Sequence, residues 1–237
     1  MHTLLDLRGT IPTFIHLSDG KMHDVRILDT IPLEPDACYI MDRGYFDFER
    51  LHTIHAQAAY FIIRSKESLS FQRMYSHEIG ENTGLRCDQT IHLKHFYARK
   101  RYPEKLRRIK YYDELSDKYY VYLTNNFDIS AQTVADLYKH RWQIELFFKW
   151  MKQHLKIQVF WGYSFNAVKT QICIAISIFL LVAIMKKELN IKRDLYEILQ
   201  ILSVSQFEKI VLTSLLSAAT LQNDEDDRQE RLPLDVF

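Results

Sequence analysis

The feature that most constrains this chain is a helical segment, residues 138–152, in which four polar residues recur at regular spacing. They are Tyr138, Arg141, Glu145 and Lys152. At about 100° per residue, they fall within roughly a 60° sector of one helix. Apolar residues repeat on the neighbouring sector, so Glu145 stands between a buried face and an open face. A carboxylate between cations indicates a metal ligand beside a polyanion; the alternative is an exposed Glu with salt-bridge partners on an amphipathic helix.

Composition is that of a globular protein and does not by itself identify a partner. Hydrophobic residues make up 47% of the 237 residues, charged residues make up 26%, and the net charge is +1. Any nucleic-acid surface must therefore come from local clustering of charge. The three cysteines are far apart and match no zinc spacing, which indicates a protein of a reducing cytosol. The length suffices for one large domain or for a domain with an insertion.

A short continuous apolar run, residues 37–41, ends on Asp42. Such a run predicts a central strand that is covered on both faces. Gly44 permits a sharp exit, residues 46–58 predict a helix, and residues 60–63 predict a second buried strand parallel to the first. Asp42 is therefore expected at the carboxyl end of a central strand, where α/β sheets place their sites. The alternative is an Asp that forms a turn or caps a helix.

Residues 65–128 predict a β-rich insertion, with strands at residues 84–93, 107–112 and 118–123. Within the insertion, residues 94–110 hold eight cations and a single acid, with aromatic residues among them. Cations interleaved with aromatics fit phosphate contact together with base stacking, and a solvated hairpin face is the alternative. The residues expected to contact DNA are Arg99, Lys100, Arg101, Arg107 and Arg108.

The remaining segments read as a hairpin and a series of helices. The expected elements are a hairpin at residues 3–7 and 11–17, the helix at 131–154, further helices at 166–188, 191–202 and 206–216, and a charged tail at 224–231. The apolar run at residues 172–185 has 14 residues, whereas a membrane-spanning helix needs about 20. It therefore predicts a helix packed under the sheet and no membrane contact.

The order of these features resembles the DDE transposases of bacterial insertion sequences, in the branch named for its Tyr-Arg-Glu-Lys signature (insertion-sequence family four). The resemblance rests on Asp-Arg-Gly-Tyr at residues 42–45, Tyr-Phe-Ile-Ile-Arg at residues 60–64, and the spacing in residues 138–152. It covers the chain from the first hairpin to about Lys187. It implies an α/β, RNase H-like fold, with a mixed sheet flanked by helices and a β-rich insertion before the last catalytic helix.

The resemblance also implies a division of the chain into segments. Residues 1–64 would form the first part of the RNase H-like core and residues 129–190 its second part. Residues 65–128 would form the insertion, and residues 191–237 the C-terminal helices and tail.

The activity implied by the resemblance is metal-dependent cleavage and strand transfer of transposon ends. In that family three carboxylates bind two divalent ions, Mg²⁺ or Mn²⁺. Asp42 matches the second acid and Glu145 the third, so their carboxylates are expected to converge on a shared cation. Tyr138, Arg141 and Lys152 match the residues that hold the transposon end. The implied partners are double-stranded DNA, as transposon ends and target, and a second copy of the chain, in the bacterial cytoplasm at the nucleoid.

One departure from the family pattern concerns the first acid, which lies on a strand before the hairpin that opens this chain. Asp6 is expected at the hairpin turn, and Asp19 and Asp24 in loops. We therefore expect the C-terminal part of a transposase, which cuts DNA poorly or not at all by itself. The alternative function is a non-catalytic fragment that binds DNA or dimerises and so inhibits a full-length transposase. A membrane-associated protein built on the apolar run is a third possibility.

Overall fold

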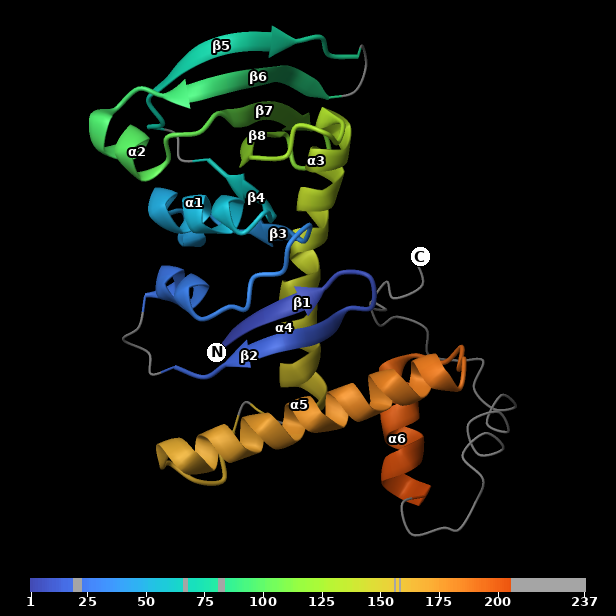
Figure 1. Cartoon of the computed structure of the whole chain (residues 1–237). Coiled ribbons are helices and arrows are strands. Elements are labelled where there is room, and N and C mark those ends of the chain that lie inside the picture. The colour runs from blue at the N-terminus through green and yellow to red at the C-terminus, as the bar shows by residue number, and fades with distance from the viewer. Residues whose placement is uncertain (19–22, 66–67, 81–83, 156, 158, 206–237) are drawn as a thin grey trace. The chain divides into compact units, whose positions relative to one another are not determined.

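A computed structural model describes residues 1–18, 23–65, 68–80, 84–155, 157 and 159–205 (Figure 1). Two units can be distinguished in it. The first contains Met1–His2 and Ser18–Trp142, and the second contains Thr3–Leu17 and the described residues from Gln143 onward. The predicted helix at 206–216, the charged tail and Asp19 lie outside the described residues.

A six-stranded mixed sheet is the centre of the first unit, with the strand order β3-β4-β8-β7-β6-β5. Its strands are β3 (Cys38–Met41), β4 (Tyr60–Arg64), β5 (Phe71–His77), β6 (Leu85–Leu93), β7 (Leu106–Asp113) and β8 (Lys118–Thr124). β3 and β4 are parallel, and the other neighbours are antiparallel. The sheet confirms the predicted mixed α/β fold, which is consistent with an RNase H-like transposase.

The strands of residues 65–128 extend the same sheet that holds the two parallel strands. β8 pairs with β4 directly, with Ile63 opposite Leu123. The edge strand β5 was not expected, because its residues carry no alternating apolar pattern and most of them are exposed. The segment also contains a short helix, α2 (Phe96–Arg101).

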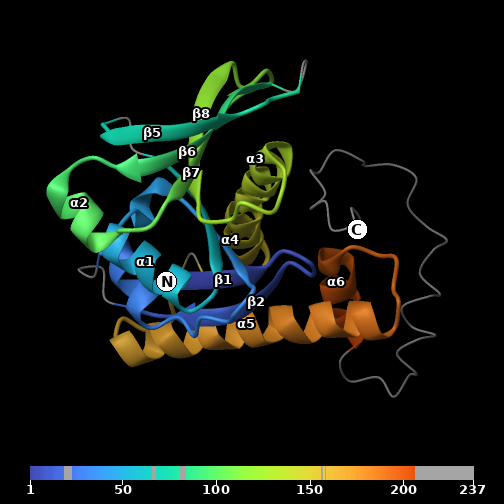
Figure 2. The same cartoon turned by 45° about the horizontal axis from the view of Figure 1, so that its top comes forward.

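Both faces of β4 are buried, as its continuous apolar run predicted. The prediction that residues 37–41 form a central strand is wrong, because β3 lies at the edge of the six-stranded sheet; an apolar run indicates cover by other elements and does not specify the place of a strand in the sheet. Ile62 packs in a cluster with Val134 and Ala135 of α3 (Ala131–Lys139). Phe61 points to the other face and contacts Tyr102, whose hydroxyl lies 2.8 Å from Nδ1 of His55 on α1 (Phe48–Ala56). The helices α1 and α3 therefore cover opposite faces of the sheet (Figure 2). Their first turns are capped by Asp47 and Ser130 side chains.

The prediction of a single helix over residues 131–154 is wrong. α3 ends at Lys139, a 3₁₀ turn follows at η3 (His140–Trp142), and α4 spans Gln143–His154. A 3₁₀ turn advances only about 20° more per residue than an α-helix, so the apolar pattern continues across it and hides the break. The four signature residues consequently belong to three successive segments and not to one sector of one helix.

The second unit is built on the helix α5 (Phe165–Glu188). Strand β2 (Ile11–His16), which forms a two-stranded sheet with β1 (His2–Asp6), packs on α5. The rings of Phe147 and Trp150 on α4 lie 5.0 and 5.2 Å from the ring of Phe179 on α5. Helix α6 (Leu195–Ser205) also contacts α5, and its Tyr196 packs on His154 of α4.

Helix α5 is only partly covered within the described residues. It was expected as a core helix, yet Ile174 and Leu181 are 55% and 65% exposed. By length and composition alone, it could cross a membrane. A core helix of a soluble protein passes the same test, so this feature is weak support for a membrane location.

Candidate functional site

Asp42 directly follows β3, at the edge of the sheet where the parallel strands β3 and β4 both end. Its side chain is exposed, and Oδ1 accepts a hydrogen bond of 2.7 Å from the backbone N–H of Arg43. Asp42 thus caps the 3₁₀ turn η2 (Arg43–Tyr45), so the position at a strand end and the capping role are both present. A carboxylate can accept about four hydrogen bonds, so capping leaves acceptor sites for a ligand.

Several of the candidate residues lie around Tyr138. It is 7% exposed, and its ring packs against Tyr122 with centroids 4.6 Å apart. Burial raises the pKa of Tyr138 to about 12, and the charge of Asp42 acts in the same direction, whereas Arg141 and Arg64 lower it. Three charged groups of the first unit therefore lie close enough to influence one phenol. Because its pKa is high, the phenol keeps its proton near neutral pH and can donate a hydrogen bond to an anion.

Arg64 belongs to this group although sequence reasoning did not single it out. It ends β4, and its guanidinium lies over the ring of Tyr120 at 4.9 Å from the centroid. The available signal was topological: the carboxyl ends of two parallel neighbours meet at one edge of a sheet. The arginine that ends the second strand should have been considered together with Asp42.

The raised pKa of Tyr138 predicts how stability depends on pH. Its pKa rises from 10.0 to about 12 on folding, so its stabilising contribution is complete below pH 10. The contribution is lost as the pH rises through 12, because the folded state disfavours the phenolate. In Tyr138→Phe, we expect a shallower fall of the urea midpoint between pH 10 and 12. Tyr163→Phe, at a 99% exposed position, is the control, and equal slopes in Tyr138→Phe and the wild type would contradict the prediction.

The other three signature residues occupy the segments that follow α3. Arg141 lies in η3 of the first unit, and Glu145 and Lys152 lie in the first and last turns of α4 in the second unit. Glu145 is half-buried and Lys152 is exposed. The convergence of Asp42 and Glu145, which belong to different units, stays a prediction.

The donor chemistry of these acids suits a hard divalent cation, since carboxylate oxygens are the ligands that Mg²⁺ and Mn²⁺ prefer. Within the described parts of the chain, no group of three or more His, Cys, Asp and Glu residues is arranged to hold a metal ion. Asp6 is the last residue of β1, at the hairpin turn as expected, and it accepts three hydrogen bonds from Arg8, which lower its pKa. Asp24 lies 3.7 Å from His2.

The basic residues of the insertion separate into exposed and buried groups. Arg99, Lys100 and Arg101 are all exposed on α2, next to Phe96 and Tyr97, which are 71% and 69% exposed. An exposed helix that carries cations and aromatic rings fits contact with phosphates and bases.

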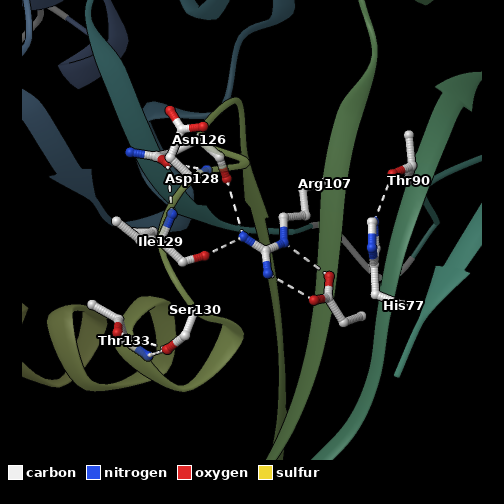
Figure 3. Close-up of polar contacts among 9 residues, drawn as sticks. His77, Thr90, Arg107, Asn126, Asp128, Ile129, Ser130 and Thr133 are labelled. Carbon is white, nitrogen blue, oxygen red and sulfur yellow. Dashed lines mark hydrogen bonds and ion pairs between the residues drawn. The ribbon is translucent and has the colours of Figure 1, made fainter. Parts of the chain in front are cut away.

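Arg107 has a different environment from the cations of α2 (Figure 3). It is 6% exposed, and its Nε and Nη2 donate to the two carboxylate oxygens of Asp88 at 2.9 and 2.7 Å. Its Nη1 donates to the carbonyl oxygens of Asn126 and Ile129, in the loop before α3. Four of its five donor hydrogens are thus engaged inside the protein. We assign Arg107 a structural role and leave it out of the residues proposed below to contact DNA.

Comparison with known proteins shows which family the chain resembles. Residues 1–181 match the family described as "Transposase DDE domain". The chain is 34% identical over 188 residues to "Putative transposase y4zB" of Sinorhizobium fredii, an alignment that covers 78% of this chain and 52% of that protein. It is 28% identical over 178 residues to "Probable transposase for insertion sequence element IS5377" of Geobacillus stearothermophilus, which covers 73% and 45% respectively. The chain spans about half the length of the curated relatives it matches.

Proposed function

Since the chain belongs to the transposase DDE domain family, we propose that it acts in the transposition of a bacterial insertion sequence, in the branch with the Tyr-Arg-Glu-Lys signature. The proposed reaction is hydrolysis of a phosphodiester at the transposon end, followed by attack of the freed 3′-hydroxyl on a target phosphodiester, which displaces the 3′-oxygen of the target strand as a new hydroxyl. The position and the charge of Asp42 support the proposal most directly. Asp42 stands at the carboxyl end of β3, beside the parallel strand β4. Beyond the effect of burial, its charge raises the pKa of Tyr138, and the charges of Arg141 and Arg64 lower it.

In this proposal Asp42 and Glu145 converge to hold Mg²⁺ or Mn²⁺. The chemistry that such ions would supply when bound is activation of a water and then of a DNA 3′-hydroxyl, together with stabilisation of the leaving oxygen. The protein itself then has to position the DNA and offset the charge of its phosphates.

Tyr138, Arg141 and Arg64 would supply that positioning next to Asp42. The protonated phenol of Tyr138 donates a hydrogen bond to a phosphate oxygen, and the two guanidinium groups neutralise phosphate charge. Lys152, exposed in the last turn of α4, would contact the DNA further along. A phenol that keeps its proton is a hydrogen-bond donor and not a nucleophile, which fits direct attack by water or by the DNA hydroxyl.

The partners of the proposed reaction are transposon-end and target duplexes, bound by a dimer of the chain in the bacterial cytoplasm at the nucleoid. The exposed cations Arg99, Lys100 and Arg101 on α2 would contact the DNA backbone, together with Arg108 on β7. Backbone contacts of this kind give affinity with little sequence preference.

A second candidate function is inhibition of a longer transposase by a fragment that binds DNA or dimerises without cutting DNA. The arrangement of the acidic residues favours it, because no three of them form a metal site among the described residues. The two functions share DNA binding and differ in cleavage.

Metal binding by Asp42 and Glu145 provides the direct test of the proposed site. We expect Asp42→Asn and Glu145→Gln each to weaken Mn²⁺ binding, followed by electron paramagnetic resonance, by at least about tenfold. The double variant should bind Mn²⁺ about as weakly as either single variant, because both ligands serve the same ion.

Asp136→Asn, which removes an exposed carboxylate from α3, is the matched control and should bind Mn²⁺ like the wild type. Additive losses in the double variant would show two independent sites and refute convergence. The proposed function as a whole fails if the chain neither binds DNA at low salt nor loses Mn²⁺ affinity in the single variants.

A further inference from the structure

A small cavity of about 100 Å³ lies against the sheet of the first unit, and arginine is its most frequent lining residue. Arg43, Arg64 and Arg108 all line it, and none of its lining residues is an acid. One water needs roughly 10–15 Å³ by the same kind of measure, so this space admits a small anion such as a phosphate group.

The cavity is largely on the face of the sheet that α3 does not cover. Tyr119 and Val121 of β8 line it. Tyr120 and Tyr122, which alternate with them, pack toward α3. Because side chains alternate along a strand, the cavity is distinct from the group around Tyr138, and only Arg64 at the strand end serves both.

Arg108 is the best-fixed cation of the cavity. Its Nη1 donates to Oε1 of Gln89 at 3.0 Å and contacts Sγ of Cys87 at 3.1 Å. Its guanidinium also lies over the ring of Phe71, another lining residue, at 4.9 Å from the centroid. These contacts do not use Nε and Nη2, so one edge of the guanidinium fork keeps its donors for an anion. An arginine held in place in this way loses little entropy when it binds.

We propose that this cavity binds a phosphate group, and that the group is a backbone phosphate of the DNA bound at Asp42. Guanidinium groups bind phosphate through paired, charge-assisted hydrogen bonds, and three of them around one small space repel each other unless an anion lies between them. Arg43 directly follows Asp42 in the chain, which places the cavity beside the proposed catalytic acid. The DNA source rests on the proposed function, whereas the phosphate chemistry does not depend on it.

The test compares Arg108→Gln with Arg86→Gln in the full chain. Arg86 is a matched control because its guanidinium, like that of Arg108, lies over an aromatic ring, here that of Tyr112, but it does not line the cavity. In calorimetric titration with inorganic phosphate, Arg108→Gln should lose at least about tenfold in affinity, since it removes a charged hydrogen-bond donor. In a KCl series with random duplex DNA, its salt slope should fall by about one.

Arg86→Gln should keep both phosphate affinity and salt slope. Arg43→Gln, at an exposed position on the same cavity, should reproduce the loss without disturbing the strands. Phosphate binding that survives Arg108→Gln, or that falls equally in Arg86→Gln, would overturn the proposal. Loss of phosphate binding with an unchanged DNA slope would overturn DNA as the source. A chain that binds phosphate through Arg108 but binds no DNA would overturn the transposase function and support the phosphate cavity.

Discussion

Replacing Arg107 with Ala is expected to destabilise the first unit by about 3–5 kcal/mol, the usual cost of removing one partner from a buried ion pair. The side chains of Arg107 and Asp88 are only 8% and 4% exposed, and two hydrogen bonds join them. The variant would leave the Asp88 carboxylate buried without a counter-charge. It would also release the loop at Asn126 and Ile129 that leads into α3. Urea denaturation followed by circular dichroism measures the loss.

Two further variants separate this explanation from a general effect of lost charge. Arg108→Ala, on the same strand but half-exposed, should cost less than about 1 kcal/mol. Arg107→Met combined with Asp88→Leu should recover most of the stability, because a buried ion pair can be replaced by apolar side chains at little cost. If Arg107→Ala keeps its stability but loses DNA affinity, Arg107 contacts DNA as the sequence suggested, and the structural assignment is refuted.

The same pair shows why the basic segment could be only partly interpreted from the sequence. The count of eight cations in residues 94–110 treats every charge alike. The partner of Arg107 is 19 residues away on the neighbouring strand β6. Which cation meets that acid depends on the register of β6 and β7, which includes a bulge, and charge patterns do not specify register. The exposed cations of α2 needed no such information, because Arg99, Lys100 and Arg101 are consecutive in the sequence and all belong to one short helix.

Apolar patterns in the sequence predicted the two parallel strands of the sheet, but they did not predict the edge strand β5 or the break between α3 and α4. Strands β3 and β4 were found because each is a continuous apolar run, and the run of β3 also placed Asp42 at a strand end. The run did not show that β3 lies at the edge of the sheet. β5 was missed because an edge strand with exposed side chains needs no apolar pattern. The break at His140–Trp142 was missed because an apolar stripe persists through a short 3₁₀ turn. The Tyr-Arg-Glu-Lys spacing identified the four signature residues, but it did not show that they lie on three successive segments, α3, η3 and α4.

We expect the polypeptide of residues 1–237 to cut end-bearing DNA at least about a hundredfold more slowly than a transposase of this family that offers three carboxylate ligands. A metal-bound transition state gains several kcal/mol from its ions, and each 1.36 kcal/mol is worth about tenfold in rate. Two acids, Asp42 and Glu145, are proposed as ligands, and the described residues offer no group of three. The assay uses labelled DNA from the ends of the element with Mg²⁺ or Mn²⁺, and Glu145→Ala as the control. Fast cleavage that disappears in Glu145→Ala would contradict this prediction.

Such a result would require a third ligand, and the described acids differ in how well they could provide it. The carboxylate of Asp6 is already held by Arg8 in the hairpin turn. Asp24 begins the 3₁₀ turn η1 (Asp24–Asp29), which packs against η2, and its charge acts together with that of Asp42 to raise the pKa of Tyr45 beyond the effect of burial. Asp24 is therefore near the same phenol as Asp42, within the same unit. If cleavage is fast, Asp24→Asn should abolish it and Asp6→Asn should not. The opposite pattern would place the third ligand in the hairpin.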